Sequence, residues 1–169
     1  MVGCAGWLSK QQYALECGSD AILFTCSAFG PCIEDVARQH PSVPVLKPNE
    51  AMIKDISALG RRVGLVATFP PTLESMPSEF PRDITLECQL AESALAAMND
   101  GNGDLHDQLI AAAAVRLAAF GCEVIALAQF SMARAKSLVE RRTGLPVLST
   151  VDSAVAELKR RLDGVAPRS

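Results

Sequence analysis

An internal repeat constrains the fold of this chain more than any other feature of its sequence. The segment Gly18–Cys26 resembles Gly121–Gln129, because each has a glycine, then an acidic residue, then a short apolar run that ends in a polar side chain. Short uninterrupted apolar runs are typical of parallel strands that are buried on both faces. Helix-like segments follow both runs, over residues 31–39 and 131–142. Each half of the chain therefore contains the same strand–helix unit.

The repeat continues into a second strand and a second helix. Each helix-like segment leads to a strand with the motif Pro-Val-Leu, at 43–46 and at 145–148, with a one-residue gap near Pro41. Asn49 and the pair Ser149-Thr150 then stand where helices begin, and such side chains are good N-caps. Two unrelated strand–helix units that merely look alike are the alternative. We predict an α/β fold of two pseudo-symmetric Rossmann-like lobes, each built on a parallel sheet.

The expected first lobe comprises residues 1–60 with 149–169, and the expected second lobe comprises 61–148. Within the second lobe, strands are predicted at 63–67 and 84–89, helices at 91–98 and 105–120, and a turn at 99–103. The long helix is expected to present one apolar face, made of Leu105, Leu109, Ala113, Leu117 and Phe120. Only seventeen residues precede Gly18, whereas about sixty, from Arg61 on, precede Gly121. The first lobe is therefore expected to be incomplete and to lack its first strand, either because the sequence begins late or because the lobe is truly reduced. The exposed sheet edge that this leaves favours association or instability.

Composition excludes several classes of function. The net charge is -3 and no basic run is present, so the sequence offers no electrostatic footprint for nucleic acid. No apolar stretch approaches the roughly 20 residues that span a bilayer. The six cysteines lack the paired spacing of a zinc site, and the start does not read as a secretory signal. We expect a cytoplasmic protein with reduced thiols and with neither a metal nor a membrane partner.

The chemistry is expected where the strands end, because ligands of open parallel sheets bind beyond the carboxyl ends of the strands. Cys26 lies where a strand gives way to a helix, and the free N–H groups and partial positive charge of a helix start favour a thiolate. The same N–H groups, with Ser27, are suited to a substrate carboxylate. A buried cysteine without chemistry is the alternative reading.

The threonines that follow the 63–67 strand form a second candidate group. Thr68 and Thr72 are hydroxyl donors suited to a carboxylate or an enolate, and N-capping of the next helix is the alternative for this segment. Neither histidine is expected to take part. His40 follows a helix at the end of the sheet opposite the predicted site, and His106 lies in the first turn of the long helix; both are expected at the surface.

The acidic and glycine-rich turn before the long helix shows no metal or phosphate signature. Asp100, Asp104 and Asp107 lack the alternation of a calcium loop and are interpreted as turn and cap residues. The sequence Gly101-Asn-Gly103 is too short for a phosphate-binding loop and does not follow a strand.

Three segments together resemble the aspartate/glutamate/hydantoin racemase superfamily, which also contains arylmalonate decarboxylase and maleate isomerase. They are Asp20-Ala-Ile-Leu-Phe-Thr-Cys26-Ser-Ala, the strand Val63-Gly-Leu-Val-Ala-Thr68, and the second strand end at Gln129. The resemblance runs from Gly18 to Leu162. Family members often have Cys-Asn-Thr where this chain has Cys26-Ser27-Ala28. They often have Leu-Gly-Cys-Thr where this chain has Leu127-Ala128-Gln129-Phe130.

The resemblance implies a mechanism without a cofactor, in which two cysteines flank the α-carbon of a small carboxylate or amino acid. It also implies a possible homodimer. Gln129 replaces the second cysteine, and an amide neither gains nor loses a proton near neutral pH, so only one-sided chemistry through Cys26 remains. The implied substrate-binding residues are Ser27, Ala28, Thr68, Thr72, Gln129, Phe130 and Ser131. Cys26 and Gln129 are expected to face each other across a cleft between the lobes.

The leading hypothesis is a cofactor-independent racemase-like or isomerase-like enzyme that transfers a proton at the α-carbon with a single cysteine. The alternatives are a lyase similar to arylmalonate decarboxylase and a non-catalytic member that binds a small acid. A thiol-dependent hydrolase is less consistent with the sequence, because it requires a histidine near Cys26.

Overall fold

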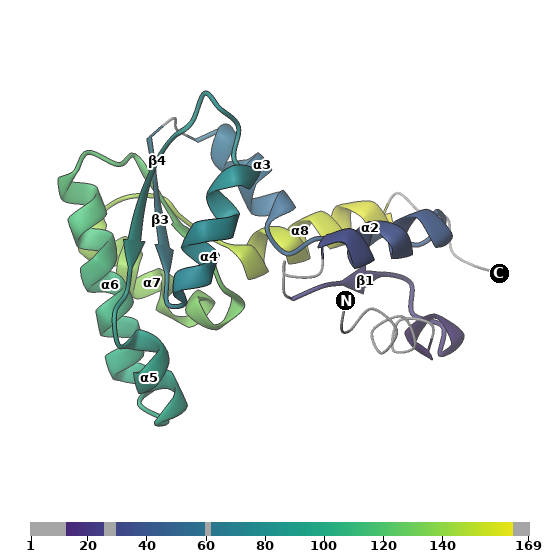
Figure 1. Ribbon diagram of the computed structural model, residues 1–169, viewed down its shortest axis with the longest axis horizontal. Coiled ribbons are helices and arrows are strands. Elements are labelled where there is room, and N and C mark those ends of the chain that lie inside the picture. Colours follow the sequence, from purple (N-terminus) through teal and green to yellow (C-terminus); the bar gives the residue numbers. More distant parts are fainter. Residues whose placement is uncertain (1–12, 26–29, 60–61, 164–169) are drawn as a thin grey trace. The chain divides into compact units, whose positions relative to one another are not determined.

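The protein divides into two compact units in the computed structural model, which describes residues 13–25, 30–59 and 62–163 (Figure 1). Unit 1 comprises residues 1–51 and 154–169, and unit 2 comprises residues 52–153. The lobes expected from the sequence, 1–60 with 149–169 and 61–148, have their boundaries outside helices. The compact units instead divide within α3 (Glu50–Ser57) and α8 (Thr150–Asp163). The reason at α3 is packing, because Met52, Ile53 and Ile56 belong to a core of unit 2.

The centre of unit 2 is a four-stranded parallel sheet in the order β4-β3-β5-β6. Its strands are β3 (Arg62–Ala67), β4 (Thr85–Leu90), β5 (Val124–Leu127) and β6 (Val147–Ser149). Val63 lies opposite Leu86 on one side and Val124 on the other. All of β5 is buried, as its uninterrupted apolar run predicts. The predicted parallel α/β fold is thus confirmed for this unit.

Side chains alternate across the sheet and form two separate cores. Val66, Ile125 and Leu127 point to the core under α6 (Gly103–Ala119) and α7 (Lys136–Thr143). Leu65, Ala126 and their neighbours point to the opposite core, which is covered by α3, α4 (Pro70–Ser75) and the 3-10 helix η2 (Met76–Glu79). Figure 1 shows β3 and β4 between α6 and α4. The sheet is therefore the middle layer of a three-layer unit.

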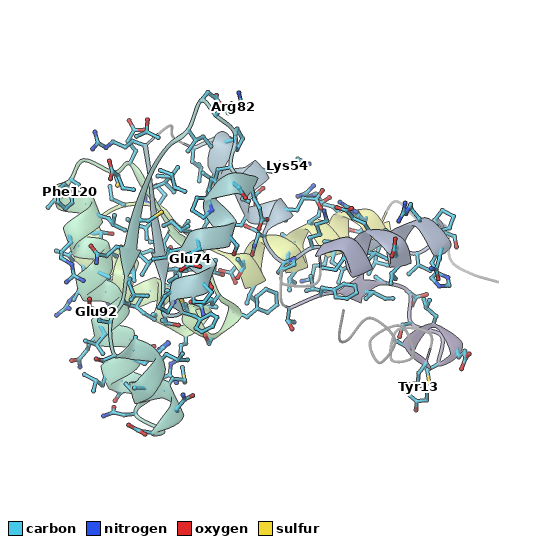
Figure 2. All side chains as sticks on the ribbon, viewed as in Figure 1. Tyr13, Lys54, Glu74, Arg82, Glu92 and Phe120 are labelled. Carbon is cyan, nitrogen blue, oxygen red and sulfur yellow. The ribbon has the colours of Figure 1, made fainter. Side chains whose placement is uncertain are left out.

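The long helix α6 matches the predicted element, but its apolar face is shifted. Ile110, Ala113 and Leu117 are fully or almost fully buried, as are His106 and Ala114. Leu105 and Phe120, which were expected on this face, are 42% and 65% exposed, and Phe120 projects from the edge of the unit (Figure 2). Phe120 lies beyond the end of the helix, and the buried stripe runs through His106 rather than Leu105.

The remaining predicted elements of unit 2 occur with small shifts. The predicted 91–98 helix is α5 (Ala94–Asn99), and the 99–103 turn contains Gly101 with φ of +76°. The predicted 131–142 helix consists of two elements, the 3-10 helix η3 (Phe130–Ala135) and α7. Charged side chains such as Lys54, Glu74, Arg82 and Glu92 are exposed (Figure 2). Within the described ranges, no helix is long and apolar enough to cross a membrane.

Close packing between α6 and β3 depends on Gly64. A β-carbon built on Gly64 lies 2.9 Å from Ile125 Cδ1 and 3.0 Å from Leu117 Cβ. No side chain fits there unless the helix or its neighbours move. Gly64 therefore sets the distance between the central strand and the longest helix of the unit.

Unit 1 contains a smaller parallel pair, β1 (Ile22–Leu23) and β2 (Val45–Leu46). A helical stretch at 13–16 precedes β1, and α2 (Gly30–Gln39) connects the two strands. Phe24, Ile33 and Val36 form its core, with Ile22 and Val45 packed against them. The later part of α8 also belongs to this unit. The predicted strand–helix–strand order is confirmed here too.

The two units share backbone geometry at equivalent positions, which confirms the internal repeat. Gly18 and Gly121 both have φ of +83°, the left-handed conformation that ends a helix and favours glycine. At the helix ends, Ser19 N–H donates to Ala14 O at 3.1 Å, and Cys122 N–H donates to Leu117 O at 3.2 Å. At the strands, Ile22 N–H donates to Pro44 O at 2.8 Å, and Ile125 N–H donates to Pro146 O at 2.9 Å. Because the second pair spans the predicted one-residue gap, strand register is the same in both halves.

Candidate functional site

The carboxyl end of the unit 2 sheet gathers the polar residues that the sequence singled out in this half of the chain. Thr68 follows β3, Gln129 lies two residues after β5, and Ser149 ends β6. Because β3 pairs with β5 and β5 with β6, all in parallel, these three residues lie along one edge of the sheet. This is the edge at which open parallel sheets bind ligands.

Thr68 and Gln129 are bonded directly to each other. The Gln129 Oε1 atom accepts the Thr68 backbone N–H at 2.6 Å and the Thr68 hydroxyl at 3.0 Å. The backbone N–H can only donate, so the amide atom that faces it must be the oxygen. Thr68 is 5% exposed, whereas Gln129 is half-buried. This pair, called here the Thr68–Gln129 bracket, joins the ends of two neighbouring strands.

The bracket determines what each side chain can offer a ligand. The amide oxygen of Gln129 already has two donors, so its Nε2 group, with two N–H donors, is the part that can bind an acceptor. Among the described residues, Nε2 has no hydrogen-bond partner. The Thr68 hydroxyl proton is directed at Gln129 and not at open space. The edge therefore presents an amide donor suited to a carboxylate.

The neighbouring predicted residues occupy less enclosed positions. Phe69, not Thr68, is the N-cap of α4, and it forms no side-chain cap, so the capping alternative for Thr68 is wrong. Thr72 lies in the first turn of α4 and is half-buried. Phe130 and Ser131 begin η3, half-buried and exposed respectively. Cys26, Ser27 and Ala28 lie outside the described residues, so their predicted roles stay predictions.

The end of β6 contributes buried hydroxyl groups. Ser149 Oγ accepts the Asp152 N–H at 3.1 Å and caps α8, as the sequence predicted. Thr150 is fully buried, and its hydroxyl has no hydrogen-bond partner among the residues that the structure describes. The Lys136 ammonium lies 2.8 Å from the Asp152 carboxylate and, with Ser149, holds the pKa of Asp152 below its usual value.

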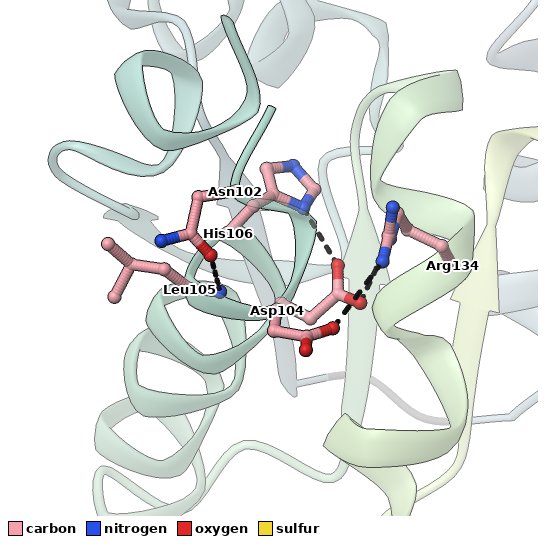
Figure 3. A network of polar contacts seen from close by, with 6 residues as sticks. Asn102, Asp104, Leu105, His106 and Arg134 are labelled. Atoms are coloured by element: carbon pink, nitrogen blue, oxygen red, sulfur yellow. Dashed lines mark hydrogen bonds and ion pairs between the residues drawn. The ribbon is translucent and has the colours of Figure 1, made fainter. Parts of the chain in front are cut away.

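The prediction for His106 is wrong, because this histidine is 1% exposed. Its Nδ1 donates to Asp107 Oδ1 at 2.8 Å, and the Asp107 Oδ2 atom accepts from Arg134 Nε at 2.9 Å (Figure 3). The sequence offered little signal for this network, since Arg134 comes from a different element. His40 is half-buried just after α2.

The environments of Cys88 and Cys122 do not favour a thiolate. Cys122 is buried and Cys88 is exposed, and desolvation is the main cause that raises the pKa of both thiols. A raised pKa keeps a thiol protonated and weakly nucleophilic. The described ranges also contain no group of histidine, cysteine, aspartate and glutamate side chains that is suited to a metal ion.

One cavity in unit 1 lies away from the strand ends that were expected to carry the chemistry. It has a volume of about 450 Å³ and is lined by the Pro41–Val45 turn that leads into β2, by Ala37, and by Arg160 and Arg161. Both guanidinium groups pair with Glu157. It lies at the amino end of β2, so it does not coincide with the predicted site.

Comparison with known protein families shows which family this chain belongs to. Residues 3–158 match the family described as Asp/Glu/Hydantoin racemase. The chain belongs to this racemase family. A search of curated proteins found no match.

Solved structures of racemases and a decarboxylase share the fold of this racemase-family chain. An allantoin racemase from Klebsiella pneumoniae is 22% identical, with a TM-score of 0.77, and the alignment covers 98% of this chain and 69% of that one. A glutamate racemase from Bacillus anthracis is 12% identical, with a TM-score of 0.68 and coverages of 95% and 64%. An arylmalonate decarboxylase is 21% identical, with a TM-score of 0.69 and coverages of 96% and 77%. The chain thus spans about two thirds to three quarters of these proteins' lengths.

Proposed function

We propose that this protein is a cofactor-independent isomerase or lyase that acts at the α-carbon of a small carboxylate. Cys26 moves the proton, and the Gln129 amide binds the substrate as a hydrogen-bond donor. The observation that carries the proposal is the Thr68–Gln129 bracket, which commits the amide oxygen to Thr68 and leaves the N–H donors for a carboxylate. Membership of the racemase family supports the chemistry at the α-carbon.

Gln129 favours chemistry on one face of the substrate. Racemisation by two thiols requires an acid or base on each side of the α-carbon, and an amide supplies neither. In isomerisation, Cys26 in its thiolate form takes a proton from the α-carbon, and the electron pair passes into an enolate held by hydrogen-bond donors. Return of the proton by the same thiol restores the starting configuration, so it gives exchange at the α-carbon without net isomerisation. Isomerisation is complete only when water delivers a proton to the opposite face of the enolate and the Cys26 thiol gives its proton back to solvent.

A lyase is the second candidate, and it is favoured by Gln129, an amide that stands where the family resemblance implies a second thiol. In decarboxylation, the bond between the α-carbon and one carboxyl group breaks, carbon dioxide leaves, and the electron pair remains as an enolate. The Cys26 thiol then protonates the α-carbon, and water reprotonates the thiolate. This reaction needs one proton donor, which matches one cysteine and one amide.

The test is α-carbon chemistry in deuterated water. The substrate panel follows the names of the structural neighbours and contains allantoin, glutamate, aspartate and arylmalonates. Deuterium at the α-carbon together with an inverted configuration identifies an isomerase, and deuterium in a decarboxylated product identifies a lyase. Cys26→Ser is expected to abolish either signal. Cys122→Ser is the matched control and is expected to retain it, because Cys122 is buried in the core of unit 2.

Absence of exchange and turnover across the panel, with stabilisation by a dicarboxylate, would contradict the enzyme proposal and identify a binding protein. Retention of full activity in Cys26→Ser would contradict the proposed role of the thiol. Loss of dicarboxylate binding in Gln129→Met, compared with Gln129→Glu and with wild type, measures the role of the amide independently of turnover.

A further inference from the structure

The network of His106, Asp107 and Arg134 connects α6 to the segment that follows Gln129 (Figure 3). Asp107 lies in the first turns of α6, and its side chain is 15% exposed. Arg134 lies on η3, which begins directly after Gln129. One carboxylate oxygen accepts from His106 and the other accepts from Arg134. The carboxylate is therefore fixed on both sides, and it holds η3 against α6.

Stabilisation of the fold is not a sufficient explanation for the ion pair between Asp107 and Arg134. The Arg134 side chain is 48% exposed, so solvent screens its attraction to Asp107 and the ion pair is weak evidence of stabilisation. Its geometric effect is clearer. The Asn102 side chain accepts the Leu105 N–H at 3.1 Å and caps the start of α6, so the arginine is anchored to a well-formed helix end.

Gly103 is part of the same arrangement. A β-carbon built on Gly103 lies 2.6 Å from Arg134 Cζ and would clash with the guanidinium nitrogens. The φ of Gly103 is not in the left-handed region, so its backbone does not require glycine. The guanidinium of Arg134 instead occupies the space that a side chain at position 103 would fill. The Gly101-Asn-Gly103 sequence, which is no phosphate loop, thus allows Arg134 to pack closely against the start of α6.

The segment held by Arg134 leads directly to the bracket. Gln129 is the N-cap residue of η3, and its carbonyl accepts the Met132 N–H at 3.0 Å. A short 3-10 helix has poor hydrogen-bond geometry, so its own backbone fixes its position weakly. Met132 and Ala135 anchor one side of η3 in the core, and Arg134 anchors the other. Displacement of η3 would therefore move Gln129 relative to Thr68.

We propose that Arg134, seated on Gly103 and held by Asp107, is a positioning residue for Gln129. It keeps η3 against α6, so that the amide oxygen stays on Thr68 and the amide N–H donors stay available to a ligand. The functional meaning of this positioning rests on the proposed function. The positioning itself does not, because the experiment that tests it requires no substrate.

The experiment uses the full-length, ¹⁵N-labelled protein and two signals. One is the side-chain amide resonance of Gln129, assigned by its disappearance in Gln129→Met. The other is hydrogen exchange of the Thr68 backbone amide, which donates to Gln129. Arg134→Met removes the charge at similar length, and Gly103→Ala displaces the guanidinium with Arg134 still present. Both are expected to shift the Gln129 resonance and to speed Thr68 exchange about five- to tenfold.

Three further variants separate positioning from general stability. Arg134→Lys retains a charge for Asp107 and is expected to restore part of the wild-type signal. Gly64→Ala destabilises the packing of the same helix without touching η3, so it is expected to lower the melting temperature and leave the Gln129 resonance in place. Arg142→Met, an exposed substitution on α7, is expected to change neither.

Wild-type Gln129 resonance and Thr68 exchange in either Arg134→Met or Gly103→Ala would overturn the inference. Because Gly103→Ala adds a single methyl group against a flexible side chain, it is expected to fold even if Arg134→Met does not. If both variants change the Gln129 resonance and Thr68 exchange but the wild-type protein is inactive, only the proposed function is refuted. If the wild-type protein is active but the variants change neither signal, only the positioning role is refuted.

Discussion

Gln129→Met removes the acceptor that joins β3 to β5 and leaves two donors of Thr68 without a partner. Thr68 is 5% exposed, so water cannot readily replace the amide. A buried donor left unsatisfied costs about 1–3 kcal/mol, and the half-buried position of residue 129 relieves part of this cost. We expect a loss of about 2–4 kcal/mol in the free energy of unfolding. Methionine has a similar length, so cavity formation contributes little.

Two companion variants divide this cost between the bonds. Gln129→Glu retains an oxygen that accepts from both Thr68 groups at neutral pH, and it is expected to lie closer to wild type. Thr68→Val removes the hydroxyl and keeps the backbone donor, so a loss of about 0.5–1.5 kcal/mol is expected. In a double-mutant cycle, Thr68→Val is expected to cost less in the Gln129→Met background, because its acceptor is already gone.

The assay is urea unfolding followed by circular dichroism at 222 nm, with hydrogen exchange of the Thr68 amide as the local probe. The local probe is needed because a chain of two compact units does not have to unfold in a single two-state transition. If Gln129→Met unfolds within about 0.5 kcal/mol of wild type and Thr68 keeps its protection, the bracket contributes nothing to stability and the reasoning is refuted.

Three more predictions concern packing, pH and thiol chemistry. Gly64→Ala overpacks the space between β3 and α6 and is expected to cost about 1–3 kcal/mol, read as a lower melting temperature; an unchanged value would contradict the close approach. Asp152→Asn is expected to cost a few tenths of a kcal/mol at pH 7, because the Lys136 ion pair is half exposed. Since the pKa of Asp152 is lowered in the folded state, this difference should persist above the unfolded pKa and vanish as pH falls through the folded pKa in urea titrations. Cys88 and Cys122 have raised thiol pKa values and are expected to react with iodoacetamide at pH 7.5 more slowly than a model thiol in mass-spectrometric labelling; fast labelling of either in the folded protein would contradict this.

The strands of both units could be predicted because their signal is local and repeated. A run such as Val124–Leu127 has no polar face, and only a sheet covered on both sides buries it completely. Glycine at equivalent positions, Gly18 and Gly121, marked the helix ends that precede the repeated strands β1 and β5. The boundaries of the two units are harder to predict from local sequence. Assignment of α3 to a unit depends on which core Met52 and Ile56 join, and this is decided by tertiary packing.

The apolar face of α6 was misplaced for a physical reason. Spacing from Leu105 predicted a stripe through Leu109 and Phe120, whereas the buried stripe passes through His106 and Ile110. A histidine is buried at low cost only when its ring nitrogen finds a partner, and Asp107 provides one next to it in sequence. Asp107 is held in turn by Arg134, which lies 27 residues away on η3. Helical periodicity contains no information about such a distant partner.

The candidate site was predicted residue by residue, but its chemistry depends on a pairing that the sequence left open. Gln129 was expected to bind a ligand and Thr68 to donate its hydroxyl, as two independent contributions. The parallel register of β3 and β5 places them in contact, so that they form one unit with a single free function, the amide N–H donors. A thiol at position 129 is too short and too weak an acceptor to serve both Thr68 donors. At position 129 of this chain, the amide therefore forms a structural bond to Thr68 and presents a donor of fixed orientation. The one-sided chemistry of the proposed function rests on this arrangement, because an amide transfers no proton near neutral pH.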